Sequence, residues 1–208
     1  MIVCARASAS RRAILTVPVL LPLLDAARAH AGDSDYKKFL GYSAAPDLYL
    51  GYGQKNDNRV ADPPLYSFEY PADWTEEIPT KTEKSTMGMD GRVMHPSTRK
   101  ELAYVVALGG KDYRDSVLKD ARSSLIVFAG GDPDLRQAVT DGKVEQATKR
   151  VNGSDLFVFD IASDKRRYLS SIGKKGDTVF ALVVTAPANA FERDYAGLKH
   201  IQDTFQLL

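Results

Sequence analysis

One stretch of the chain, between residues 144 and 185, constrains the fold more than any other. It contains four runs of β-forming residues: Val144–Val151, Asp155–Ile161, Lys165–Ile172 and Thr178–Thr185. The first two runs are separated by Asn152-Gly153, the strongest two-residue signal for a β-hairpin. The last two are joined through Gly173-Lys174-Lys175-Gly176. The sequence therefore predicts an antiparallel meander of four strands.

A helix is predicted directly after the meander. Pro187 has a fixed φ that suits the first turn of a helix. The apolar residues beyond it recur three or four positions apart and form a single stripe: Phe191, Tyr195, Leu198, Ile201 and Phe205. We expect this helix to lie across the sheet.

The residues before the meander add further strands and helical segments. Strands are predicted over Tyr66–Tyr70, Met87–Met94 and Glu101–Leu108, and helical segments within Lys111–Ala129 and over Asp134–Thr140. Antiparallel hairpins with helices segregated from them indicate an α+β fold, an antiparallel sheet flanked by helices in an α/β sandwich. The length of 208 residues, 44% of them hydrophobic, is typical of one domain with a core of its own.

The motif Phe68-Glu69-Tyr70-Pro71-Ala72-Asp73-Trp74 marks the entry to that domain. Phe68 and Tyr70 alternate on one face of a short strand, and Pro71 ends it because proline has no backbone donor. Trp74 is the only tryptophan of the chain, and we expect its side chain to close the core.

The first 31 residues have the pattern of a cleavable export signal. Arg11-Arg12 precedes an apolar run over residues 13–24, and Ala29-His30-Ala31 forms a cleavage motif. Twin arginines favour the twin-arginine export route. Residues 1–10 lack acidic side chains, as organelle transit peptides do. An organelle address followed by a twin-arginine signal indicates the thylakoid lumen of a chloroplast, with a bacterial periplasm as the alternative.

The predicted organisation is therefore a signal over 1–31, an N-terminal arm over 32–65 and a folded domain over 66–208. The arm is rich in Gly, Asp, Tyr, Asn and Pro and shows no sustained periodicity. Its tyrosines indicate contacts, either with the edge of its own domain or with a partner.

No catalytic motif occurs in the sequence. It has no G-x-S-x-G, H-E-x-x-H, P-loop or C-x-x-C pattern, and its single cysteine, Cys4, lies in the predicted signal. We expect a protein that is not an enzyme and has no cofactor. Acidic loops at Asp132-Pro133-Asp134 and Asp160–Asp164, or His95 with nearby acids, are the candidates for Ca²⁺ or Mn²⁺. His200 is off the apolar stripe of the last helix, which predicts exposure to solvent.

Basic residues near the ends of the meander strands are the candidate docking residues: Lys149, Arg150, Lys165, Arg166, Arg167, Lys174 and Lys175. The chain carries a formal net charge of only +1, so its bulk charge indicates no nucleic-acid partner. Side chains near shared strand ends can form one local patch, which favours docking to an acidic partner or an anionic membrane surface. The alternative is that these residues protect a sheet edge from aggregation.

Three features together resemble the PsbP family of extrinsic proteins of the thylakoid lumen. They are the FEYPADW entry, the twin-arginine signal and the ending YLSSIGKKGDTVFALVVTAPANAFERDYAGLKHIQDTFQ. The resemblance covers about residues 60–208 and implies an antiparallel sheet flanked by helices. It also implies a peripheral protein that docks on a photosynthetic membrane complex, chiefly photosystem II, where it supports assembly, stability or calcium retention. An assembly factor for another thylakoid complex, an exported calcium- or manganese-binding protein and an exported enzyme are the alternatives.

Overall fold

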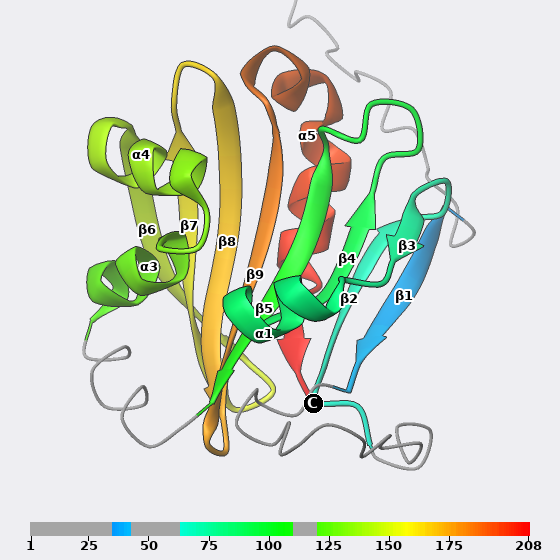
Figure 1. The fold of residues 1–208 in the computed structure, drawn as a ribbon, viewed down its shortest axis with the longest axis vertical. Helices are drawn as coiled ribbons and strands as arrows, with labels where there is room; N and C mark the ends of the chain where they lie inside the picture. The colour runs from blue at the N-terminus through cyan, green and yellow to red at the C-terminus, as the bar shows by residue number, and fades with distance from the viewer. Residues whose placement is uncertain (1–34, 43–62, 110–119) are drawn as a thin grey trace, which may run out of the picture. The chain divides into compact units, whose positions relative to one another are not determined.

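The structure is a computed structural model that describes residues 35–42, 63–109 and 120–208. The predicted signal and most of the predicted arm lie outside the described residues. The described strands form two antiparallel sheets (Figure 1). The smaller has the order β1-β2-β10, with bounds Tyr36–Gly41, Tyr66–Pro71 and Gln206–Leu207. The larger has the order β3-β4-β5-β9-β8-β7-β6, with bounds Thr75–Glu77, Met89–Met94, Leu102–Gly109, Thr178–Pro187, Arg166–Lys175, Ser154–Ala162 and Lys143–Val151.

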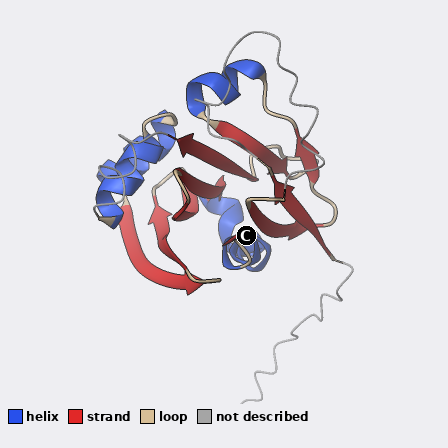
Figure 2. Ribbon diagram, turned by 90° about the horizontal axis from the view of Figure 1, so that it is seen from below, coloured by secondary structure: helices blue, strands red, loops and turns tan. Residues whose placement is uncertain are grey.

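The helices are α1 (Lys81–Met87), α3 (Ala121–Ala129), α4 (Pro133–Asp141) and α5 (Ala188–Asp203). Their starts follow local sequence chemistry. Asp120 and Asp132 accept backbone N–H groups at the starts of α3 and α4. A capping box between Thr80 and Glu83 begins α1, and α5 follows directly after Pro187, as predicted. Figure 2 shows helices at the margin of the strands and one helix near the centre of the view, with strands around it.

Alternate residues of the central strand β9 enter two different hydrophobic clusters. Phe180, Leu182 and Val184 face the first cluster, between the larger sheet, the smaller sheet and α5. Val179, Ala181 and Val183 face the second cluster, beneath α3 and α4. Since side chains alternate across a strand, this arrangement buries both faces of the sheet at its centre.

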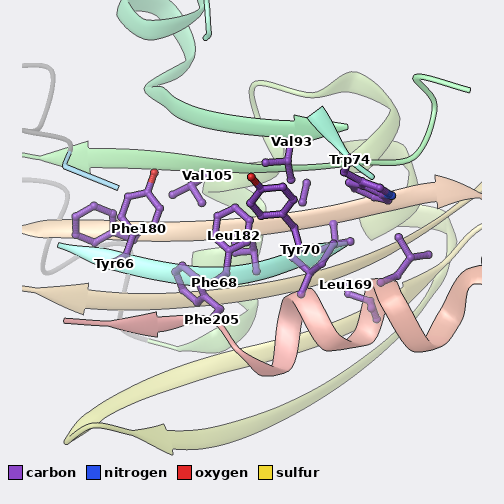
Figure 3. Packing of buried hydrophobic residues seen from close by; sticks show 14 of the residues in the cluster. Tyr66, Phe68, Tyr70, Trp74, Val93, Val105, Leu169, Phe180, Leu182 and Phe205 are labelled. Carbon is purple, nitrogen blue, oxygen red and sulfur yellow. The ribbon is translucent and has the colours of Figure 1, made fainter. Parts of the chain in front are cut away.

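The first cluster contains the predicted entry motif (Figure 3). Phe68 and Tyr70 of β2 and the Trp74 indole are all buried, which confirms the expected place of Trp74 in the core. Ala72 N–H donates to the Asp35 carbonyl and Trp74 N–H to the Pro71 carbonyl, forming the turn after β2. The α+β fold predicted from the sequence is confirmed.

The four-strand meander is confirmed, but the turn between its last two strands is shorter than predicted, because Gly173, Lys174 and Lys175 belong to β8 and pair with β9. Asn152 and Gly153 have φ of 50° and 81°, as the turn of a two-residue hairpin requires. One detail of the last helix is wrong, because Tyr195 of the predicted stripe is 39% exposed. The backbone of α5 ends at Asp203, and Phe205 is buried in the short segment after it.

Four described elements were not predicted: β1, α1 and the short strands β3 and β10. Strand β1 falls within the predicted arm and pairs along its whole length with β2. A Cβ atom at Gly41 would lie 2.0 Å from the ring of Tyr66, so β1 is fitted closely against the body. Helix α1 has no buried residue, so its sequence has no apolar stripe from which a helix could be predicted. None of the described helices is long and apolar enough to cross a membrane.

Candidate functional site

The seven basic residues predicted for docking lie at two opposite ends of the meander. In the ladder, Lys149 stands opposite Leu156 and Leu156 opposite Gly173, so Lys149 and Arg150 share one end with Lys174 and Lys175. Arg167 pairs with Ala162 at the other end. The ten residues of β8 separate the two groups by about 30 Å. The expectation of a single patch is therefore wrong, because the two ends of a strand lie at opposite ends of the sheet.

We call Lys149, Arg150, Lys174 and Lys175 the turn-end group. All four side chains are exposed. The Lys149 ammonium donates to the Asp203 carbonyl at 3.0 Å, and Arg150 Nε lies 3.8 Å from an Asp155 carboxylate oxygen. Lys174 and Lys175 end β8 just before Gly176, whose φ of 57° forms the tight turn. The group therefore carries its charge on a short turn and a neighbouring strand end.

The opposite group is held by contacts within the fold. Arg166 donates to the Thr185 hydroxyl at 3.1 Å and to the Lys100 carbonyl at 2.6 Å. Arg167 pairs with Asp160 at 2.9 Å, and its guanidinium lies 4.6 Å from the centroid of the Phe191 ring. Both arginines are half-buried, and only Lys165 of this group is exposed. Two of the three charges are therefore already engaged internally.

A cavity of about 410 Å³ opens beside this second group, between α4 and the β7–β8 turn. Lys143, Lys165 and Arg166 contribute positive charge to its lining, and three aspartates contribute negative charge: Asp134, Asp141 and Asp164. The Tyr168 hydroxyl also lines it, and burial raises the pKa of that group to about 12. The lining has both signs of charge and offers no activated nucleophile.

A smaller cavity of about 200 Å³ lies next to Trp74. Its lining includes His95, Glu101 and Asp194. The Glu101 side chain is only 1% exposed, and an Arg193 nitrogen lies 3.5 Å from its carboxylate. Burial, with the charge of Asp194 as a second cause, raises the pKa of Glu101 above its ordinary value. Sequence reasoning missed this residue, because a glutamate before a strand is usually solvated.

His95, the predicted metal candidate, uses one ring nitrogen within its own loop. Its Nδ1 accepts backbone N–H groups of Ser97 at 3.2 Å and Thr98 at 3.4 Å. Its ring meets the Trp74 indole edge to face, with centroids 6.2 Å apart. Among the described residues, no group of three or more His, Cys, Asp or Glu side chains has the arrangement of a metal site.

His200 is half-buried, whereas exposure to solvent was predicted. Its Nε2 lies 2.9 Å from a carboxylate oxygen of Glu69, and its ring lies against Tyr36 with centroids 3.8 Å apart. The Glu69 and His200 side chains are 43% and 32% exposed. The cluster ties β1, β2 and α5 together. Glu69 and His200 are 131 positions apart, so no local pattern could have predicted the contact.

The comparisons with known proteins agree with the family resemblance. No family model matches the chain. The thylakoid lumenal 19 kDa protein of Arabidopsis thaliana, a chloroplastic protein, is 26% identical over 200 residues, which cover 95% of this chain and 84% of the relative. The solution structure of cyanobacterial PsbP from Synechocystis superposes with a TM-score of 0.53 at 14% identity, covering 88% of this chain and 98% of that one. The chain has a PsbP-type fold.

The predicted resemblance to PsbP is thereby confirmed: the chain is homologous to a thylakoid lumenal protein and has the PsbP fold. The predicted localisation in the thylakoid lumen of the chloroplast is confirmed by the same relative. The cyanobacterial structure is too dissimilar in sequence to establish more than the fold. The docking role of the seven basic residues stays a prediction.

Proposed function

We propose that this PsbP-like protein is a non-enzymatic extrinsic protein of the thylakoid lumen that docks on a photosynthetic membrane complex. The turn-end group is the observation that carries the proposal. It places four exposed basic side chains at one end of the meander of a chain whose net charge is only +1. A local positive surface on a near-neutral protein favours an acidic partner, because complementary charge steers association and fixes orientation.

The structure divides the predicted docking residues into those that are available and those that are engaged. Arg166 and Arg167 contact Lys100, Thr185, Asp160 and Phe191 within the fold. Lys174 and Lys175 are exposed at a turn. We therefore assign docking first to the turn-end group and give Arg166 and Arg167 a structural role.

The test compares binding to isolated thylakoid membranes at rising salt concentration. Charge-led docking predicts release by a wash of roughly 0.3–1 M salt, because the screening length falls to about 3 Å at 1 M. The variant Lys174→Glu with Lys175→Glu is expected to weaken binding at least about tenfold at low salt. Its matched control is Lys37→Glu with Lys38→Glu, since β1 carries a second exposed Lys-Lys pair.

Retention through the salt wash, with release only by detergent, would contradict charge-led docking. Equal weakening by both double variants would show an effect of net charge rather than of the turn-end group. Normal binding by the Lys174/Lys175 variant would remove the group from the proposal. Circular dichroism of each variant checks that the fold is unchanged.

The partner that we propose is photosystem II or one of its assembly intermediates, with another thylakoid complex as the alternative. The support is the family resemblance together with the lumenal relative. Affinity capture of the wild-type chain from solubilised thylakoids, with the Lys174/Lys175 variant as the background, identifies what binds through this surface. Recovery of a different complex with the same charge dependence would replace photosystem II as the partner.

Calcium retention is the finer part of the proposal, and direct binding of Ca²⁺ or Mn²⁺ is its metal-binding alternative. The cavity beside His95 is the place that would supply carboxylate oxygens, from Glu101 and Asp194. Calorimetric titration with each ion, repeated on His95→Ala and on Glu101→Gln, separates a site in this cavity from binding elsewhere. No heat at millimolar ion would end the metal-binding alternative.

A further inference from the structure

Strand β6 forms one edge of the larger sheet, and it is long and open. It pairs only with β7, and no other described strand lies along its outer side. Figure 1 shows it at the margin of the sheet, behind α3 and α4. Seven of its nine residues are exposed, and only Val144 and Val151 are half-buried. Native proteins usually shorten, cover or interrupt such edges, because unpaired backbone groups invite another strand.

The hairpin determines which backbone groups of β6 are free to bind. Val151 and Ser154 flank the two-residue turn and form a hydrogen-bonded pair, and hydrogen-bonded pairs then alternate along the strand. Odd-numbered residues of β6 therefore direct their N–H and C=O groups to β7. Those of Gln146 and Thr148, among the even-numbered residues, point to the open edge.

A second copy of the chain can meet this edge in very few ways. A two-fold axis perpendicular to the sheet leaves each side chain of β6 on the same face in both copies. Residues that stand opposite each other must also lie on one face, so the axis has to pass through a residue and not between two residues. Only an axis at Ala147 uses all nine residues of β6. In that register, Glu145 of each copy stands opposite Lys149 of the other, and Ala147 stands opposite itself.

This register is favourable for charge, for shape and for hydrogen bonding. The Glu145–Lys149 pairs occupy positions that are not hydrogen-bonded to the second copy, where opposing side chains come closest. Gln146 of one copy and Thr148 of the other occupy the hydrogen-bonded positions. The small side chain of Ala147 leaves the two-fold axis unobstructed. Lys143 meets Val151 and Val144 meets Arg150, so no like charges stand opposite each other.

We propose that β6 is a self-complementary edge through which two copies of this chain pair into one continuous sheet. The charges that would form the new pairs are held only at the surface in the single chain. Glu145 contacts Lys143 at 2.5 Å and the Lys149 ammonium contacts Asp203, all with well-exposed side chains. Surface ion pairs of this kind exchange partners readily.

The other described sheet edges do not have this property. Strands β3 and β10 have three and two residues, too few for a stable ladder. Strand β1 has six, and a two-fold axis at Lys38 would place that ammonium opposite its own copy. Among the described edges, β6 therefore offers the longest register in which no like charges stand opposite each other.

The test exchanges the charges of Glu145 and Lys149. It measures the dimer fraction of the full chain by sedimentation velocity, over about 1–200 μM protein at low salt. We expect a dimer fraction that rises with concentration. Glu145→Lys alone and Lys149→Glu alone each place like charges opposite each other and should raise the dimer dissociation constant at least about tenfold. The double variant restores opposite charges, and its dissociation constant should return to within about threefold of the wild type.

A proline substitution tests the backbone part of the pairing. Thr148→Pro removes an N–H group that points to the open edge and leaves the ladder to β7 intact, so it should abolish the dimer. Thr148→Ala is the matched control and should keep it. A chain that stays monomeric at 200 μM, or a double variant that fails to regain the dimer, would overturn the proposal. The docking test uses Lys174 and Lys175, so either result can fail without the other.

Discussion

Strands β9 and β6 belong to the same antiparallel sheet, and they show what its centre and its margin do. Eight of the ten residues of β9 are buried, whereas none of the nine residues of β6 is. β9 has a strand on each side and a hydrophobic cluster on each face. β6 has one neighbour and carries both signs of charge. The centre determines the stability of the fold, while we propose that the margin and its turns bind partners.

The two regions also shift the pKa of a glutamate in opposite directions. Glu101 lies just before β5, beside the centre, and burial raises its pKa. Glu145 lies on β6, and a hydrogen bond from Lys143 followed by the charge of that ammonium lowers its pKa. The same side chain is therefore favoured as an acid at the centre and as an anion at the margin.

The largest expected effect comes from a buried ring on β9. Phe180→Ala should lower the free energy of unfolding by about 4 kcal/mol, because a fully buried ring is removed from a packed cluster. Urea titration measures the change. The control is Phe157→Ala on β7, a half-buried ring nearer the margin, which should cost about 1–2 kcal/mol. Equal losses for the two variants would contradict the contrast between centre and margin.

Trp74 tests the border of the core. Trp74→Ala should lower the free energy of unfolding by about 3 kcal/mol, because the indole is 6% exposed and joins the first cluster. The loss is smaller than for Phe180, since the side chain also borders the cavity next to His95. The wild-type emission of this single tryptophan should shift to the red on unfolding. A loss below about 1 kcal/mol would instead indicate a surface residue.

These differences explain what could be predicted from the sequence. The first hairpin of the meander was predictable with its register, because Asn152-Gly153 specifies a turn type and the turn specifies the pairing of β6 with β7. The last helix was predictable from its stripe, apart from Tyr195, which lies at the exposed side of α5. Local chemistry and burial agree in these elements.

Contacts between distant segments were not predictable. Glu69 and His200 meet only after the smaller sheet and α5 have assembled, and Glu101 is buried by α5 and by the loop after β4. The sequence contains one usable signal for helix α1, the capping box of Thr80 and Glu83. The sequence analysis also missed the division of the basic residues into two groups, although Lys165 and Lys174 lie at opposite ends of one predicted strand.

A pH titration sharpens the contrast between the two glutamates. The folded state binds the Glu101 proton more tightly than the unfolded chain does, because the pKa of Glu101 is raised. Its contribution to stability is therefore full below the ordinary carboxyl pKa of about 4.3 and is lost as the pH rises through the raised value. Glu101→Gln should be at least as stable as the wild type at neutral pH, with an advantage that shrinks as the pH falls.

The measurement is urea unfolding of both proteins between about pH 4 and pH 8. Asp194, whose pKa is lowered first by a hydrogen bond from Arg193, contributes with the opposite sign in both proteins. Glu145→Gln is the control at the margin, where the sign is reversed: any advantage of the wild type should be present at neutral pH and lost in acid. A difference between wild type and Glu101→Gln that does not change with pH would show that folding does not shift the pKa of Glu101 and would contradict the raised value.

The smallest expected effect is on β6 itself. Gln146→Ala changes an exposed side chain that has no neighbour beyond the edge among the described residues. At protein concentrations of about 1 μM or below, where self-pairing does not contribute, the free energy of unfolding should change by less than about 0.5 kcal/mol. Urea titration repeated at a hundredfold higher concentration then separates the two roles of the margin. A loss above about 1 kcal/mol in the dilute sample would mean that β6 supports the core as β9 does, and the contrast between centre and margin would fail.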